Sequence, residues 1–437
     1  MLDQTAFTRR QFMNTGLAVV STVATVPTFL HNFALAASDE NAAALTLSRP
    51  GVPEDRILVV VQLSGGNDGL NTLVPYGAPE YYKARPAIAI RQNDILRVDQ
   101  GQGVGLHNQL AGLKDLMDDG NASVIQGVGY PNPNRSHFAS MDIWHTCQAR
   151  GGKGLGWLGK ALDQVAADAS SAMIAIGRES PLAGQGKRTT PVSFENAELF
   201  RWTGRDLHHE LGQQYDAINR AGVLSPAGAG PNPGAAVGVD DQAAFVMRTA
   251  LDAQLASDRI RRAIGKGTLT DFPRGPLANQ LRMVAAMIRA GLPTRVYYVG
   301  LGGFDTHGGQ PFRHANLLRQ FGTAMKGFYR ELKALGQDGR VLSMAFSEFG
   351  RRVAQNASQG TDHGTAGPMF LFGPMVRPGV LGKHPSLTRL DDGDLIYNVD
   401  FRSVYAAALE GWLKADSQKV IGKAFKPAPV LDAKKIA

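Results

Sequence analysis

The sequence of 437 residues contains a single cysteine, Cys147. One thiol cannot form an intramolecular disulfide, and it cannot assemble a cysteine-based zinc cluster. The fold must therefore be held together by its hydrophobic core, without covalent cross-links.

The sequence also lacks any long basic run, although its formal net charge is +8. Lysine and arginine are scattered, and no nucleic-acid-binding motif accompanies them. We therefore expect no nucleic-acid partner. The positive charge suits an anionic small molecule or an anionic envelope ester as the substrate.

Internal repeats are absent, and no apolar stretch of membrane-spanning length follows the N-terminal region. The composition, 43% hydrophobic and 19% charged, is that of an ordinary globular protein. The 51 glycines and 23 prolines predict many ordered loops, on which functional sites are often built. These features favour an enzyme over a helical bundle.

The N-terminus carries the pattern of a twin-arginine export signal. Arg9 and Arg10 stand just before an apolar stretch over residues 16–30, and small residues at 34–36 fit a signal peptidase site. Polar residues and Pro27 interrupt the stretch, which favours a cleaved signal over a permanent membrane helix. A retained N-terminal anchor is the alternative.

These boundaries predict a signal peptide over residues 1–36, a linker over 37–55 and one α/β domain over 56–437. A helical insertion or cap is predicted over 194–269, around a loop rich in Gly, Pro and Ala. The twin-arginine translocase would be a partner during export. The mature chain would be periplasmic or secreted, with no stable transmembrane segment.

Apolar runs bounded by glycine-rich or polar turns predict buried strands, which are residues 56–63, 122–126, 295–301, 341–346 and 369–372. Helices are predicted over 277–290 and 315–335. Strands that alternate with helices indicate an open, mostly parallel sheet with right-handed crossovers.

Polar side chains gather where these strands end, which is where open α/β sheets bind ligands. The residues are Asn67, Asp68, Arg135, Ser136, His137, Asp305, His307, Glu348, Asp362 and His363. Carboxylates together with neutral imidazoles suit zinc, manganese or a similar divalent ion.

Each of these residues also has an ordinary structural interpretation. Ser136 could cap a helix, Asp68 could form a turn, and Glu348 could pair on the surface with Arg351 or Arg352. The histidines could be structural or solvated. Their joint appearance at four strand ends favours a site, because the ordinary explanation must otherwise hold independently at each place.

Long motifs resemble a known family. They are LVVVQLSGGNDGLNTLVP, RSHFASMDIWHT, FDTHGGQ, FSEFGRR and TDHGTAGPMFLFG, and they extend over nearly the whole mature chain. They resemble the exported bacterial proteins of unknown function in the superfamily of alkaline phosphatases, sulfatases and cofactor-independent phosphoglycerate mutases. The resemblance implies an alkaline-phosphatase-like three-layer fold, with a largely parallel sheet between helices. It also implies one or two metal ions at the sheet edge and a hydroxyl nucleophile that attacks phosphorus or sulfur.

Carried onto this sequence, the resemblance implies metal-binding roles for Asp68, Asp305, His307, Glu348 and His363. Asn67, His137 and Asp362 are further candidates for ligands. Ser136 stands at the nucleophile position, and Arg135 would help to neutralise charge on the transferred group. The expected cofactor is zinc, manganese or calcium.

Three features depart from the family pattern. Phe349 follows Glu348 where many relatives have His or Asn, and a phenyl ring cannot bind a metal. Asp305 and His307 are separated by one residue where relatives commonly have three. Ser136 lacks the Cys/Ser-x-Pro-x-Arg pattern of sulfatases, which disfavours classical sulfatase chemistry.

We therefore predict an exported metal-dependent hydrolase of phosphate or related sulfate esters. The alternative is a non-catalytic periplasmic binding or scaffold protein with a degenerate metal site, which Phe349 favours. A third hypothesis is a transferase that passes a phospho-group to an alcohol.

Overall fold

The structure is a computed structural model that describes residues 55–148, 154–166, 172–195, 260–262, 264–265 and 267–436. The predicted signal peptide, the linker up to residue 54 and most of the predicted insertion lie outside these residues. The chain divides into two compact units, and the fold and site described here belong to the larger one, residues 45–193 with 266–437. Among the described residues, no helix combines the length and apolarity that a membrane span requires.

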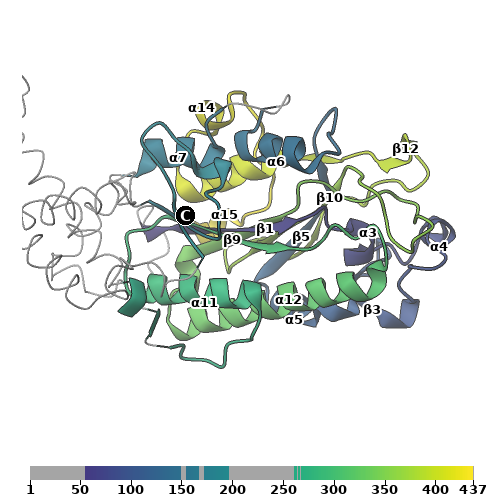
Figure 1. The fold of residues 1–437 in the computed structure, drawn as a ribbon, viewed down its shortest axis with the longest axis horizontal. Coiled ribbons are helices and arrows are strands. Elements are labelled where there is room, and N and C mark those ends of the chain that lie inside the picture. The colour runs from purple at the N-terminus through teal and green to yellow at the C-terminus, as the bar shows by residue number, and fades with distance from the viewer. Residues whose placement is uncertain are drawn as a thin grey trace, which may run out of the picture. The chain divides into compact units, whose positions relative to one another are not determined.

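A mixed sheet of nine strands forms the centre of this unit (Figure 1). Its strands are β1 (Ile57–Ser64), β5 (Ala122–Gly129), β6 (Met173–Ile176), β7 (Val192–Phe194), β8 (Val296–Gly302), β9 (Val341–Phe346), β10 (Gly367–Phe372), β11 (Gly379–Leu381) and β14 (Val399–Asp400). The order is β11-β5-β10-β9-β1-β8-β6-β7, and β14 pairs with β5 outside this path. The predicted α/β fold with a largely parallel sheet is confirmed.

Most neighbouring strands are parallel, and β10 is the exception. β1 is parallel to both β8 and β9, with Leu58 opposite Val296 and Ile57 opposite Val341. β10 runs antiparallel to β9 and to β5. No crossover helix separates β9 from β10, so the chain returns into the sheet from the edge at which β9 ended. The start of β10 therefore lies beside the carboxyl ends of β9 and β5.

Helices cover both faces of the sheet (Figure 1). One layer contains α5 (Ala111–Asp118), α11 (Pro276–Arg289) and α12 (Gln310–Ala334). The other contains α6 (His137–Thr146), α7 (Trp157–Val165), α13 (Phe401–Ala406), its π-helical continuation (Ala407–Leu413), α14 (Ser417–Ile421) and, against the π-helix, α15 (Ala433–Ile436). Helix, sheet and helix thus form the three layers that the sequence predicted.

Short elements complete the described fold. The helices are α3 (Gly69–Thr72) and α4 (Pro79–Ala84). A small sheet has the order β2 (Leu73–Val74), β4 (Val104–His107), β3 (Ile95–Asp99), and a two-stranded ribbon pairs β12 (Leu390–Asp391) with β13 (Asp394–Leu395).

The predicted bounds of most strands and helices are close to those in the structure, and the start of one helix differs by five residues. The strand predicted over 341–346 has those bounds in β9, and the helix predicted over 277–290 is α11, one residue earlier at each end. Helix α12 begins at Gln310, five residues before the predicted start at 315. Pro311 occupies its first turn, where a missing N–H is tolerated, so the helix can begin before this proline.

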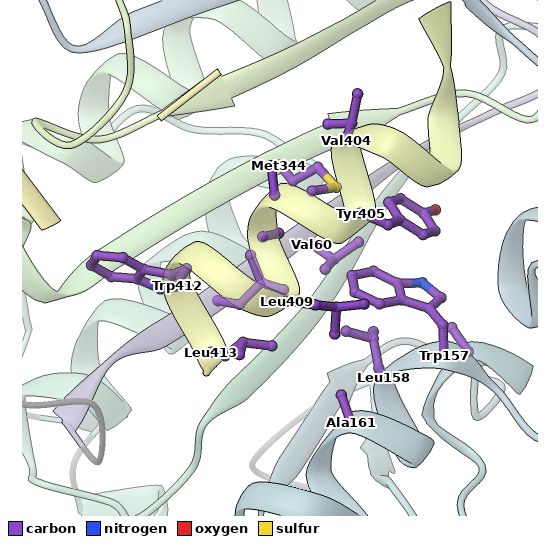
Figure 2. Close-up of a cluster of buried hydrophobic side chains, with 14 of the residues drawn as sticks. Val60, Trp157, Leu158, Ala161, Met344, Val404, Tyr405, Leu409, Trp412 and Leu413 are labelled. Atoms are coloured by element: carbon purple, nitrogen blue, oxygen red, sulfur yellow. The ribbon is translucent and has the colours of Figure 1, made fainter. Parts of the chain in front are cut away.

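One core cluster of the described residues lies between the sheet and the layer that contains α7 and α13. Val60 and Met344, on adjacent strands, face Leu409 and Trp157 (Figure 2). Trp157 stacks on Tyr405 with ring centroids 4.1 Å apart. Because alternate residues of each strand point to opposite faces, the remaining apolar strand residues pack against α11 and α12 instead. A sheet buried on both faces holds its strand ends, and the loops that follow them, in fixed positions.

Candidate metal centre

Four loops that carry the predicted site residues meet at one edge of the sheet. Three follow the carboxyl ends of β1, β8 and β9, which are adjacent and parallel. The fourth follows β5 and leads into α6, and the chain between β9 and β10 returns to the same edge. Parallel strands thus bring together residues that are far apart in the sequence.

The β1 loop approaches the β8 loop closely because of Gly65. A Cβ atom on Gly65 would lie 2.4 Å from the backbone nitrogen of Asp305, and φ is +117°. Only glycine combines that approach with that backbone conformation. Glycine at this position therefore allows the β1 loop and the β8 loop to pack against each other.

Three histidines and one aspartate form the centre of this edge. Ligand atoms of His137, Asp305 and His363 all lie within 4.8 Å of one another. The Asp305 carboxylate oxygen Oδ1 is 3.6 Å from His137 Nε2, 3.0 Å from His307 Nε2 and 3.1 Å from His363 Nε2. His307 Nε2 is also 2.9 Å from His363 Nε2. We call His137, Asp305, His307 and His363 the four-residue cluster.

The other ring nitrogen of each histidine faces a protein acceptor. Nδ1 of His137 is 2.8 Å from Glu348 Oε1, and Nδ1 of His307 is 3.1 Å from Asp362 Oδ1. Nδ1 of His363 is 2.8 Å from the carbonyl oxygen of residue 135. Outer partners of this kind orient metal-binding imidazoles and fix their tautomer.

Arg351 binds the Asp305 carboxylate from the buried side of the site. Its guanidinium is fully buried and donates to Asp305 Oδ1 at 2.6 Å. It also donates to backbone carbonyls of Gly66, Phe304 and Thr361, and so ties three of the loops together. Burial tends to raise the pKa of Asp305, but the hydrogen bond and the charge of Arg351 outweigh it and lower that pKa to about 2. Asp305 is therefore ionised at neutral pH.

Asp68 lies in a different environment, a buried polar network under the site. Asp68 and Arg85 are both 0% exposed and pair at 2.6 Å, and Gln310 also donates to the same carboxylate oxygen. Burial tends to raise the pKa of Asp68, but the Arg85 charge and hydrogen bond outweigh it and lower that pKa. Asn67 belongs to the same network, since its Oδ1 accepts from His314 Nε2 at 2.9 Å.

Glu348 is buried, and its carboxylate is occupied by protein donors. It is 2% exposed, and Oε1 accepts from the backbone N–H of Gly65 at 2.8 Å as well as from His137. The sequence suggested a surface ion pair of Glu348 with Arg351 or Arg352. This interpretation is wrong, because Arg351 binds Asp305 and Arg352 binds Asp392. Burial at a strand end excludes the solvent-exposed pairing that the sequence suggested.

Phe349 forms an apolar wall beside the imidazoles. Its ring centroid lies 5.0 Å from that of His137 and 4.7 Å from that of His363. Phe349 also lines a pocket of about 90 Å³, whose other walls include Tyr130, Pro133 and Tyr397. The phenyl ring therefore separates the four-residue cluster from an adjoining pocket.

Ser136 and Arg135 directly precede His137. Ser136 is at the N-cap position of α6 but makes no side-chain capping bond, and it is exposed. The Arg135 guanidinium donates to Asp394 Oδ2 at 2.8 Å and to Asp392 Oδ2 at 3.2 Å. Ser136 therefore stands at the cap position considered from the sequence, but its hydroxyl does not cap the helix.

The structure divides the predicted site residues into two groups. It brings together Asp305, His307, His363 and the further candidate His137, with Glu348 and Asp362 as outer partners. It places Asp68 and Asn67 in the buried network instead. Metal binding by any of them stays a prediction.

Sequence reasoning missed Arg85, Gln310 and His314, and it assigned no role at the site to Arg351. Gln310 and His314 are spaced four residues apart on α12 and are both buried, a pattern that identifies one helix face. No local signal marks Arg85, since its partner Asp68 is 17 residues away.

The chain belongs to the family described as "Protein of unknown function (DUF1501)", which matches residues 55–409. The predicted membership of a family of unknown function is therefore confirmed. No curated protein matches the chain.

Several solved structures are similar at low identity. Ps i-CgsB is 12% identical, with a TM-score of 0.36 over 84% of this chain and 75% of that chain. The PsFucS1 sulfatase from Pseudoalteromonas sp. is 13% identical, with a TM-score of 0.35 over 96% and 77%. A protein in the alkaline phosphatase superfamily from Vibrio parahaemolyticus is 9% identical, with a TM-score of 0.31 over 82% and 71%. Similarities this low say nothing about activity.

Proposed function

We propose that the protein is a divalent-metal-dependent hydrolase of phosphate or sulfate esters, with Ser136 as its nucleophile. The observation that carries the proposal is the convergence of three imidazole nitrogens on one carboxylate oxygen, with an exposed serine directly before one of these histidines in the chain. Such a group of acceptors at the carboxyl edge of an α/β sheet is a typical place for a catalytic ion.

The residues present fit a divalent ion. His137, Asp305, His307 and His363 would hold it, because the Nε2 atom of each ring lies 3.0–3.6 Å from Asp305 Oδ1. A bound ion would neutralise negative charge on the ester and lower the pKa of an adjacent hydroxyl or water. The side chains of Asp305 and His307 are 47% and 45% exposed, so a substrate can reach the cluster.

Ser136 would carry out the covalent step. Its oxygen would attack phosphorus or sulfur, the ester oxygen would leave with a proton as an alcohol, and water would then cleave the serine ester and release phosphate or sulfate. The N–H of Ser136 donates to Asn134 Oδ1 at 2.8 Å, which fixes the backbone at the nucleophile. His137, the next residue, is fixed by Glu348. The nucleophile and one ligand therefore share one rigid helix start.

The pocket beside Phe349 would receive the organic group of the ester. It is lined mainly by aromatic and aliphatic side chains, with Asn132, Thr365 and Asp391 as polar groups. Mostly apolar walls with a few polar groups are typical of small-molecule sites. The pocket favours an ester whose alcohol has an apolar or ring-shaped face.

A direct test measures hydrolysis of aryl phosphate, phosphodiester and aryl sulfate esters, with and without added zinc, manganese or calcium. We expect turnover that depends on metal and falls by at least about 1000-fold in Ser136→Ala, because removing a nucleophile removes the covalent route. Ser386→Ala, at an exposed serine in a different loop, is the matched control and should keep full activity. Full activity in Ser136→Ala would exclude the serine mechanism.

The non-catalytic binding protein is the second candidate. Arg135 favours it, because Asp392 and Asp394 already neutralise the guanidinium that the sequence assigned to the transferred group. The position of Phe349 now favours the enzyme, because its ring packs against two imidazoles and does not leave a gap among the ligands. Metal-loaded protein that turns over none of the esters would support the binding protein.

A further inference from the structure

We infer that the four-residue cluster holds a single ion of the zinc class, and that no second ion binds at this edge of the sheet. This inference rests on the proposed function, because it concerns the same site. It goes further in fixing the number of ions, their chemical class and the role of the remaining carboxylates.

The hydrogen bonds define which nitrogen of each imidazole can bind an ion. Glu348, Asp362 and the carbonyl of residue 135 accept hydrogen bonds, so the Nδ1 atoms that face them carry the protons. In a neutral imidazole the opposite nitrogen, Nε2, then has a lone pair and no proton. All three Nε2 atoms lie within 3.6 Å of Asp305 Oδ1, which is itself an acceptor, because it accepts from Arg351. A proton on one ring would relieve one such contact, whereas a cation would relieve all of them.

Most of the spacings in the cluster are close to those of a tetrahedral ion. Zinc binds histidine nitrogen at about 2.0–2.1 Å, so the ligand atoms of a tetrahedral zinc lie roughly 3.3 Å apart. Four of the six pairs of these atoms lie 2.9, 3.0, 3.1 and 3.6 Å apart. His137, Asp305 and His363 lie mutually within 4.8 Å and His307 lies outside that group, so one ion held by all four would draw His137 and His307 together. Three nitrogens and one oxygen suit zinc, whereas calcium and magnesium prefer oxygen ligands. The set therefore selects against calcium.

Asp68 is not free to hold a second ion. Its partner Arg85 is fixed by the backbone carbonyls of Val353 and Arg352, at 2.8 Å each. Asp305 also pairs with a guanidinium, that of Arg351, but the Asp305 side chain is 47% exposed. A divalent ion on Asp68 would stand beside Arg85 in a fully buried site, where the repulsion between the two cations is screened least. Asp68 Oδ1 and Asn67 Nδ2 are buried and have no hydrogen-bond partner among the described residues, and unpaired buried polar atoms of this kind suit a water molecule. The guanidinium supplies the positive charge that an ion would bring.

Glu348 acts as a positioning residue for His137. Its oxygens already accept from the N–H of Gly65, the hydroxyl of Ser347 at 3.2 Å and His137. At 2% exposure it has little access to a solvated ion. A carboxylate behind an imidazole raises its basicity and fixes its orientation. Glu348 thus strengthens one ligand of the single ion.

The test is the number of ions bound by the full chain after removal of metal with a chelator. Calorimetric titration with zinc alone should give one site per chain, confirmed by elemental analysis after desalting. Calcium alone should bind at least about 100-fold more weakly. Cobalt(II) in place of zinc should give the visible absorption of a four-coordinate nitrogen and oxygen site.

Variants assign the site to the cluster. His307→Ala should weaken zinc binding by more than about 100-fold, since even loss of an outer partner costs roughly 10–100-fold. His384→Ala, at a half-buried histidine that contacts the carbonyl of Pro385, is the matched control and should bind as the unsubstituted chain does. Normal zinc binding by folded His307→Ala would overturn the inference.

The outcomes separate this inference from the proposed function. Two zinc ions per chain, or a preference for calcium, would overturn the inference while ester turnover supported the function. One zinc per chain with no turnover would support the inference and contradict the function. Absence of binding by zinc and by calcium would overturn both.

Discussion

Two groups of carboxylates at one edge of the sheet have opposite environments. Asp68 is fully buried, and its negative charge is paired at 2.6 Å with the equally buried Arg85. Asp305 is 47% exposed, and three imidazole nitrogens face it in addition to Arg351. Both residues follow buried strands, β1 and β8, that are neighbours in the sheet.

The difference shows that a strand-end carboxylate is not a metal ligand by position alone. A buried carboxylate needs a fixed partner charge, because an unpaired charge in a dry interior is costly. At Asp68 the guanidinium of Arg85 fills that need, and both side chains are 0% exposed. Asp305 also pairs with a guanidinium, that of Arg351, but it is 47% exposed and three imidazole nitrogens face the same oxygen. Asp305 lies at the surface and faces the lone pairs of imidazole nitrogens, so an added cation would stabilise this arrangement.

The largest expected effect comes from a substitution that removes the buried guanidinium of Arg85. In Arg85→Met, Asp68 keeps its charge without a partner, so the free energy of unfolding should fall by about 3–5 kcal/mol. Denaturant unfolding measures the change. Lys114→Ala, which removes half of an exposed pair with Asp118, is the control and should cost less than about 1 kcal/mol. The folded variant should still bind zinc at the four-residue cluster. Equal stability of the two variants would contradict a structural role for Arg85.

The second prediction concerns pH. The buried network contains a neutral imidazole, that of His314, so we expect the free energy of unfolding to fall in acid. Burial lowers the pKa of His314 from 6.5 to about 4. As pH falls below 6.5 the unfolded chain takes up a proton first, so the contribution of His314 to stability is full above pH 6.5 and lost by about pH 4. A difference of 2.5 units corresponds to about 3 kcal/mol.

The test compares unfolding free energies between pH 7 and pH 4 for the parent chain and for His314→Gln. The variant should have a smaller slope with pH, whatever its absolute stability. An unchanged slope would show that His314 is not held neutral by the fold.

The smallest expected effect concerns Glu348, which stands between the two groups. In Glu348→Ala, His137 loses its outer partner, so zinc affinity should fall by roughly 10–100-fold while the number of ions stays at one. Zinc titration measures both quantities. If Glu348 were itself the ligand of a second ion, its removal would lower the number of ions from two to one.

Much of the fold could be predicted because its signals are local. The apolar run that forms β1 and the one that forms β9 identify buried strands without knowledge of their neighbours. The antiparallel direction of β10 could not be read in the same way, since it depends on how the loop after β9 returns.

The candidate site was predicted in part for the same reason. Asp305, His307 and His363 stand in short polar motifs after or before strands, and these motifs are visible in the sequence. The importance of His137 depends on a contact with Asp305 from a different loop, 3.6 Å away. The role of Arg351 depends on carbonyls of three loops, so no local pattern reveals it.

The sequence by itself determined the residue types, the buried strands and the edge of the sheet at which polar groups gather, because hydrophobic periodicity and glycine-rich turns act over a few residues. Only the tertiary structure decided which carboxylate is neutralised and which is left facing imidazoles. That choice follows from burial and from partners far away in the chain, such as Arg85 for Asp68 and Arg351 for Asp305. Electrostatic pairing in an interior depends on distances in space, and a linear sequence does not contain them.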